Sequence, residues 1–299
     1  MRIPMTRLDA TQLGKRLVPA LARLYKEMRE DDVLGIAAEL AFRFFLALFP
    51  FFIFLAALGG FVADMLSVSN PTEEIINLFG GSLPTDTESV IRTQVDAVVG
   101  SSNAGLLSIG MLGALFAASG GVGTIMKASN RAYGVRETRP ALRRYALAVV
   151  LTILGGLLLV AAFVLFLAGQ VYGSDLDTKL GIGGFTADIL SLARWPAVTA
   201  LALIATAVLY WATPATKLPF RLVTPGSLIF VVGWLAVSYV FGVYVANFGS
   251  FNTTYGTLGG VAITLTWFYF TGAILIAGIE VNAMLDHDVR QAKEAPPDS

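Results

Sequence analysis

Long apolar runs without a single Asp, Glu, Lys or Arg constrain this chain more than any other feature. Four runs of 20 to 30 residues lie at 44–63, 104–126, 145–174 and 195–216, and a fifth extends from 222 to 279. A helix needs about 20 residues to cross the hydrocarbon core of a bilayer. Only 14% of the 299 residues are charged, against about 25% in typical soluble domains. The sequence therefore predicts an integral membrane protein.

The run at 222–279 is too long for one helix and contains its own break. Residues 247–256 are rich in Gly, Asn, Ser and Thr, a composition typical of turns. A split at this point gives six spans in total. Runs of this length satisfy their backbone groups in lipid as helices and not as barrel strands. The predicted fold class is all-α, with one polytopic membrane domain over residues 1–299 and six transmembrane helices.

Three segments outside the spans carry their own signals. Residues 1–35 have leucines at helical spacing among basic residues, which predicts an amphipathic cytoplasmic segment. Its helix either lies on the inner leaflet or packs on the bundle. Residues 64–103 contain two helix-start patterns, at 70–73 and 85–88, and predict a cap of short helices on the outer face. Residues 286–299 are predicted to form a cytoplasmic tail.

Lys and Arg are distributed unevenly between the two sides that six spans define. Residues 1–35 hold seven, residues 127–144 hold six, and the fourth connection and the C-terminal tail hold two each. The opposite side holds only Arg92 and Lys179. Cytoplasmic segments of membrane proteins carry such an excess. We therefore predict that both termini are cytoplasmic.

Polar side chains in or near the spans are candidates for function, because they are costly in lipid. Glu39 and Arg43 lie four residues apart on one helical face, in the order that suits an ion pair. Glu280 and Asn282 lie near the end of the sixth span, and Glu280 could pair with Arg43 or with Lys127. Two interpretations stay open: a polar substrate path, or structural ion pairs. We expect the first and sixth spans to be neighbours, so that Glu39, Arg43 and Glu280 meet.

The basic connection after the second span offers candidates for contact with lipid head groups. Arginine and lysine bind anionic phosphates, and amide or hydroxyl groups could add hydrogen bonds. The topological charge bias alone is the alternative explanation. The candidates are Lys127, Asn130, Arg131, Tyr133, Arg136, Arg139, Arg143 and Arg144.

Small residues and proline are expected to shape the packing of the spans. Gly110, Ala114 and Ala118 recur every four residues in the second span, a pattern that allows helices to approach closely. Pro50 lies within the first span and is expected to kink that helix. Packing accounts for the small residues more simply than a substrate path or an oligomer face does.

The inventory of reactive residues disfavours an enzyme. Cys is absent, which removes thiolate metal sites and thiol nucleophiles. The single His, His287, lies between Asp286 and Asp288, but consecutive helix residues point about 100° apart and do not converge on a metal. The sequence has no phosphate-binding Gly-x-x-x-x-Gly-Lys-Ser/Thr loop and no soluble basic and aromatic surface for nucleic acid. We expect no enzyme activity, no cofactor or metal, and no nucleic-acid partner.

Four short motifs give the chain a resemblance to a known family. They are AAELAF at 37–42 with ALFP at 47–50, Lys127 with NRAYGV at 130–135, residues 209–210 with Pro214 and 225–226, and residues 255–260 with GIEVNA at 278–283. Together they resemble the YihY/BrkB family of bacterial inner-membrane proteins, nearly over residues 10–285. The resemblance implies six helical spans and an inner-membrane location. Arg43 stands where many members carry an uncharged residue.

The resemblance implies less about activity. Members have carried a ribonuclease label that the family does not deserve, and they have been associated with serum resistance, lipid export and solute or ion transport. Combined with the polar residues in the spans, this favours a permease or a lipid or solute translocator. Without an ATP site it would be driven by a gradient or be passive. Its partners would be membrane lipids and a small-molecule or lipid substrate. The alternative is an envelope-assembly scaffold that transports nothing.

Overall fold

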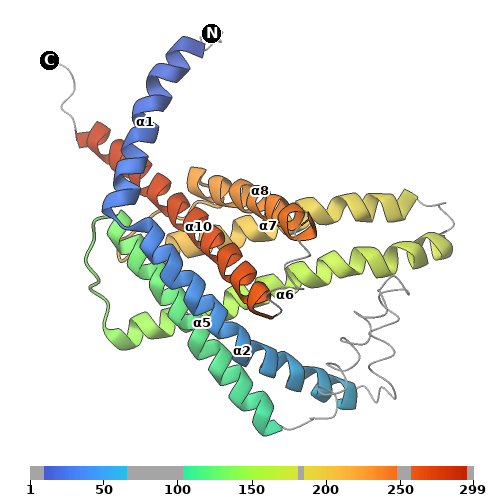
Figure 1. Cartoon of the computed structure of the whole chain (residues 1–299). Helices are drawn as coiled ribbons and strands as arrows, with labels where there is room; N and C mark the ends of the chain where they lie inside the picture. The colour runs from blue at the N-terminus through green and yellow to red at the C-terminus, as the bar shows by residue number, and fades with distance from the viewer. Residues whose placement is uncertain (1–9, 66–103, 181–184, 248–256, 295–299) are drawn as a thin grey trace. The chain divides into compact units, whose positions relative to one another are not determined.

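The computed structural model describes residues 10–65, 104–180, 185–247 and 257–294. These residues form seven α-helices and contain no strand (Figure 1). The all-α prediction is therefore confirmed for the described part of the chain. The helices are α1 (Ala10–Glu30), α2 (Val33–Met65), α5 (Ala104–Ala132), α6 (Ala141–Leu180), α7 (Phe185–Ala212), α8 (Pro225–Asn247) and α10 (Thr257–Glu294).

Five helices contain a described segment that is long and apolar enough to cross a membrane. These segments are Val33–Phe54 in α2, Ser108–Ala132 in α5, Ala141–Ala162 in α6, Pro225–Val245 in α8 and Gly259–His287 in α10. In α7 the segment Pro196–Ala212 is apolar but shorter. The long run at 222–279 divides into α8 and α10, as its turn-like residues predict. The count of six spans stays a prediction.

Helix ends do not coincide with the ends of the charge-free runs. α2 begins at Val33, well before the run that starts at residue 44, and therefore includes Glu39 and Arg43. α10 continues to Glu294, through most of the segment predicted as a tail from residue 286. A charge ends an apolar run, but Glu, Asp, Lys and Arg are accepted within a helix. The run boundaries consequently underestimate both helices.

Two residues, Asp31 and Asp32, separate α1 from α2. Asp32 adopts a positive φ of 55°, which Asp tolerates better than most residues do. Its carboxylate lies against the first turn of α2, where a Cβ on Gly35 would overlap it. The last part of α1 packs on the core through Met28, whereas Leu21 and Tyr25 are 61% and 69% exposed. The two interpretations of the N-terminal helix therefore stay open for its exposed part.

The chain divides into two compact units. The first consists of Met1–Leu40, Thr124–Arg139 and Thr206–Ser299, and the second of Ala41–Gly123 and Pro140–Ala205. Within the first unit, buried residues of α2 (Val33, Ile36 and Ala37) form a core with Ala128 of α5 and Ile276 of α10. The predicted proximity of the first and sixth spans is thereby confirmed for this part of α2.

Within the second unit, glycines of α5 face α2. A Cβ on Gly110 would overlap the backbone of Phe54, which confirms the predicted close approach at this position. Further along, Gly113 faces the ring of Pro50, and the helix α2 continues through that proline. The kink at Pro50 stays a prediction. The predicted outer cap at 64–103 lies, beyond Met65, outside the described residues.

Candidate functional site

The polar residues of the first unit gather at one end of its helices. The elements involved are the α1–α2 junction, the last turn of α5 with residues 133–139, the end of α7 with residues 213–224, the first turn of α8, and the C-terminal half of α10. Capping hydrogen bonds at these helix ends hold each loop in place and orient its side chains.

The end of α5 is a Schellman motif built on Gly134. Gly134 has a φ of 61°, its N–H donates to the carbonyl of Arg131 at 2.9 Å, and the N–H of Val135 donates to the carbonyl of Asn130 at 2.9 Å. Glycine is favoured at this left-handed position because it has no Cβ. The motif NRAYGV is thus a helix stop that places Asn130 and Tyr133 on the inner side of the turn, where both are buried.

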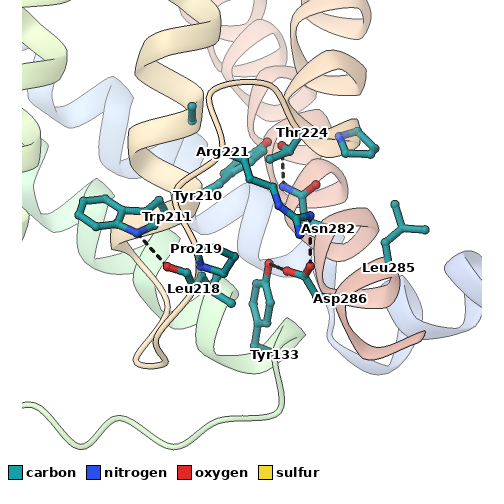
Figure 2. Close-up of a pocket in the computed structure, with 12 residues that line it drawn as sticks. Tyr133, Tyr210, Trp211, Leu218, Pro219, Arg221, Thr224, Asn282, Leu285 and Asp286 are labelled. Carbon is teal, nitrogen blue, oxygen red and sulfur yellow. Dashed lines mark hydrogen bonds and ion pairs between the residues drawn. The ribbon is translucent and has the colours of Figure 1, made fainter. Parts of the chain in front are cut away.

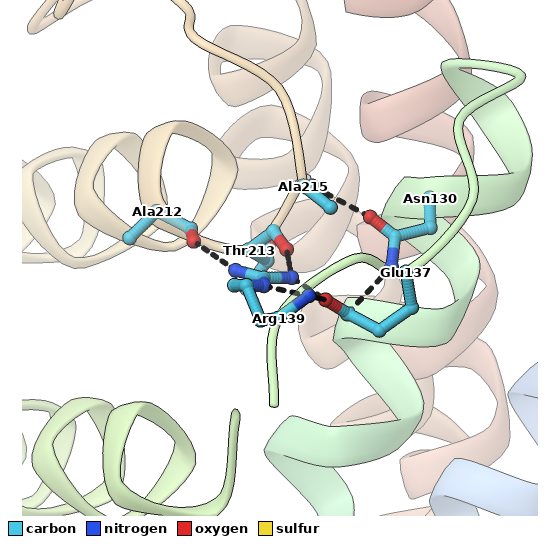
Figure 3. A network of polar contacts seen from close by, with 6 residues as sticks. All are labelled: Asn130, Glu137, Arg139, Ala212, Thr213 and Ala215. Atoms are coloured by element: carbon cyan, nitrogen blue, oxygen red, sulfur yellow. Dashed lines mark hydrogen bonds and ion pairs between the residues drawn. The ribbon is translucent and has the colours of Figure 1, made fainter. Parts of the chain in front are cut away.

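A polar network ties this turn to the end of α7 (Figure 3). Arg139 forms a bidentate pair with Glu137, at 2.7 Å from Nε to Oε1 and 2.8 Å from Nη2 to Oε2. The same guanidinium donates to the carbonyls of Ala212 (3.4 Å) and Thr213 (2.8 Å), which α7 leaves free at its C-terminus. Asn130 donates to Glu137 at 2.9 Å. The hydrogen bond from Arg139 is the main cause that lowers the pKa of Glu137 to about 2.

The first turn of α8 is capped twice. Thr224 and Ser227 form a reciprocal capping box, with the Ser227 N–H donating to Thr224 Oγ1 at 3.1 Å and the Thr224 N–H donating to Ser227 Oγ at 2.9 Å. Asn282 of α10 adds a second cap. Its Oδ1 accepts from the Gly226 N–H at 2.8 Å, and its Nδ2 donates to Thr224 Oγ1 at 3.0 Å. Asn282 therefore holds α8 against α10.

Three helices cross at two glycines beside this cap. A Cβ on Gly226 would overlap the carbonyl oxygen of Gly278, and a Cβ on Gly278 would overlap the hydroxyl of Tyr210. Tyr210 is buried and donates to the carbonyl of Leu275 at 2.7 Å. The close contact of α7, α8 and α10 thus requires glycine at both positions.

A pocket of about 100 Å³ lies where these elements meet (Figure 2). Its wall is mostly aromatic and apolar, and Arg221 and Asp286 approach each other across it at 3.8 Å between Nη1 and Oδ1. Tyr133 donates to the other oxygen of Asp286 at 3.2 Å. The pocket thus offers one cation and one anion within apolar surroundings. Its lining residues are Tyr133, Ala207, Tyr210, Trp211, Leu218, Pro219, Arg221, Thr224, Pro225, Asn282, Leu285 and Asp286.

Glu39 and Glu280 have different partners in the first unit. Lys127 Nζ lies 3.2 Å from Glu39 Oε2, and the Thr124 hydroxyl donates to Glu39 Oε1 at 2.9 Å. Glu280 is buried in α10, and its carboxyl group lies within hydrogen-bonding reach of the Asp31 carboxyl group. Lys127, one of the cations predicted for Glu280, thus pairs with Glu39. The other, Arg43, belongs to the second unit, where it lies beside Gly120.

The head-group candidates fall into two classes. Five of them make hydrogen bonds within the first unit: Lys127, Asn130, Arg131, Tyr133 and Arg139. The other three are exposed: Arg136 in the loop after α5, and Arg143 and Arg144 in the first turn of α6. Whether any of them touches lipid stays a prediction.

Sequence reasoning missed Asp31 and Arg221 as site residues. Asp31 lies in a charged stretch before the first span, and Arg221 counts in the sequence only as one of the basic residues of a loop. The sequence suggests Asp286 only as a metal ligand, a role that helix geometry disfavours, whereas in the structure it lines the pocket. Among the described residues, no group of three or more His, Asp or Glu side chains could hold a metal ion.

Comparison with known proteins identifies the family. The model of the family Virulence factor BrkB matches residues 24–299. The chain belongs to this family. A Bacillus subtilis member, YfkH, whose name describes it as ribonuclease-like, is 32% identical over 87% of this chain and 92% of its own length.

Two other relatives are named as membrane proteins. A UPF0761 membrane protein of Alteromonas mediterranea is 26% identical over 91% of this chain and 90% of its own length. The UPF0761 membrane protein YihY of Shigella boydii is 26% identical over 74% and 73%. No solved structure matches the chain. The chain is therefore an integral membrane protein of the BrkB/UPF0761 family, and the resemblance seen in its motifs is confirmed.

Proposed function

We propose that this protein is a permease, or a lipid or solute translocator, without its own ATPase. The observation that carries the proposal is the pocket of the first unit, where Arg221 and Asp286 lie in a mostly aromatic and apolar wall. Ligand sites combine a mostly apolar wall with a few placed polar groups. A cation and an anion side by side suit a small amphiphile with a charged or zwitterionic group. The pocket would admit this substrate at the ends of the helices.

The proposed setting is the bacterial inner membrane, with six spans and both termini in the cytoplasm. The uneven distribution of Lys and Arg supports this orientation, and α7 would supply the span that is short in its described part. The pocket then faces the cytoplasm, since its loops carry the basic residues. Arg136, Arg143 and Arg144 are exposed and would contact lipid head groups. We propose no enzymatic activity.

A scaffold without transport is the second candidate, and one observation favours it. Two polar side chains proposed for a substrate path are held by other groups of the chain: Glu39 by Lys127 and Thr124, and Asn282 by the first turn of α8. In a scaffold these contacts would only hold the bundle. Substitutions would then lower stability and leave no transport activity to measure.

Reconstitution separates the two functions. The purified protein is placed in liposomes, and the movement of labelled phospholipids and of a panel of osmolytes is measured for wild type, Arg221→Gln and the exposed control Lys217→Gln. We expect the wild type and the control to accelerate at least one class. Arg221→Gln should lower that rate about tenfold, the effect of losing one charged contact worth roughly 1.4 kcal/mol. Folded protein that accelerates none of these classes would contradict the proposal and favour the scaffold.

A further inference from the structure

The carboxyl groups of Asp31 and Glu280 lie in direct contact within the first unit. Asp31 belongs to the α1–α2 junction and Glu280 to the candidate span Gly259–His287 of α10, and their carboxyl groups are close enough to share a hydrogen bond. An ionised carboxylate only accepts hydrogen bonds. A bond between two carboxyl groups therefore requires a proton on one of them.

The burial of Glu280 is a second and independent observation. Glu280 is 3% exposed, and no N–H or hydroxyl of the described residues donates to its buried Oε1. A buried carboxylate oxygen without a donor is costly, and protonation of the carboxyl group removes much of that cost. This carboxyl group contrasts with Glu39, which has a lysine and a threonine as partners.

The charged groups that face the pair come from two helices. Glu27 and Glu30 of α1 are acidic, and Arg131 of α5 is the opposing cation. Arg131 donates to the backbone carbonyl of Asp31 at 2.7 Å. Burial is the main cause that raises the pKa of the Asp31 carboxyl, and the bond to Glu280 and the charge of Arg131 act against it. The surroundings are thus more acidic than basic.

We propose that Asp31 and Glu280 form a proton-binding site, and that its proton drives the transport proposed above. The coupling of this proton to transport rests on the proposed function. In the loaded state the O–H of one carboxyl group donates to an oxygen of the other. When the proton leaves to water, two carboxylates face each other and repel, and the end of α1 loses this bond to α10. The pair titrates as a unit and not as two separate groups.

One measurement tests the proton-binding site, and a second tests its coupling to transport. The first is infrared titration of the purified protein in lipid nanodiscs between about pH 5 and pH 9, with the proton as the only ligand. The carbonyl stretch of a protonated carboxyl group should be present and titrate in the wild type. It should be lost in Glu280→Gln and in Asp31→Asn, and Asp31 is only partly buried, so that variant carries little risk of misfolding. Glu39→Gln, which removes a carboxylate that already has a cation, should retain the band.

The second measurement is flux into liposomes with and without an imposed pH gradient. A gradient-dependent flux that falls about tenfold in both variants supports coupling by this proton. A band that survives in Glu280→Gln and Asp31→Asn would overturn the site itself. A titrating band, together with flux that is the same with and without the pH gradient, would overturn the coupling of the proton to transport and leave transport standing. A titrating band without any flux would overturn the proposed function and leave the proton site standing.

Discussion

Loss of Arg139 should separate the end of α7 from the turn after α5. The replacement Arg139→Met keeps an apolar stem but removes the bidentate bond to Glu137 and both bonds to α7 carbonyls. Arg136→Met is the matched control, because Arg136 flanks Glu137 on the other side and is exposed. Exposed substitutions of this kind usually change stability by less than about 0.5 kcal/mol.

The expected cost follows from the pKa of Glu137. A fall from 4.5 to about 2 corresponds to roughly 3 kcal/mol. The side chains of Arg139 and Glu137 are 16% and 21% exposed, so solvent screening reduces this to about 2 kcal/mol. The loss of the hydrogen bonds to the Ala212 and Thr213 carbonyls adds about 1 kcal/mol to this cost. Arg139→Met should therefore lower the free energy of unfolding by about 3 kcal/mol, and the melting temperature by roughly 5 °C or more.

The pH dependence gives this prediction its sharpest test. Because the pKa of Glu137 is lowered on folding, its contribution is complete above pH 4.5 and is lost as the pH falls toward about 2. Thermal unfolding of wild type and Glu137→Gln in detergent should therefore differ at pH 6 and converge below pH 4.5. The reasoning is refuted if Arg139→Met melts with Arg136→Met, or if the gap between wild type and Glu137→Gln stays constant down to about pH 3.

Three further predictions concern packing, orientation and the segment outside the described residues. Gly278→Ala should cost at least about 2 kcal/mol through overlap with the neighbouring helices, whereas Gly242→Ala, whose new Cβ meets nothing within 4 Å, should be neutral or slightly stabilising in a melting assay. A single Cys at Ser299 in this cysteine-free chain should react with a membrane-impermeant thiol reagent only after the cytoplasmic side is opened, and labelling from the outside would reverse the topology. Residues 71–99 should show helical protection from hydrogen exchange, and solution-like exchange throughout would contradict the predicted cap.

Local patterns predicted the elements of the fold well, because helices and their ends are encoded over a few residues. The charge-free runs indicated the helices, and the turn-like residues at 247–256 separated α8 from α10. The motif NRAYGV could have been interpreted as a helix stop, since Gly134 stands at the position where a left-handed residue is needed. The predicted positions of the helix ends were less accurate, because a charged residue such as Glu39 ends an apolar run without ending the helix.

Contacts between distant segments could not be predicted from the same patterns. Spacing indicated that Glu39 and Arg43 share a helical face, but it gave no sign that Lys127 would pair with Glu39 or that Asp31 would meet Glu280. The basic loop illustrates the same limit. Charge alone made its Arg residues equivalent, whereas folding engages Arg139 with Glu137 and leaves Arg136 exposed.

Blocking the pocket tests the proposed translocation most directly. Since the chain lacks Cys, Leu285→Cys places a single thiol in the pocket wall, and Thr138→Cys places one at an exposed position of the loop after α5. Both proteins are reconstituted in liposomes, and flux is measured before labelling, after complete labelling with a bulky disulfide-forming reagent, and after reduction. We expect labelling at 285 to stop flux and reduction to restore it, while labelling at 138 has no effect. Full flux through completely labelled Leu285→Cys protein would contradict the assignment of this pocket as the substrate entrance.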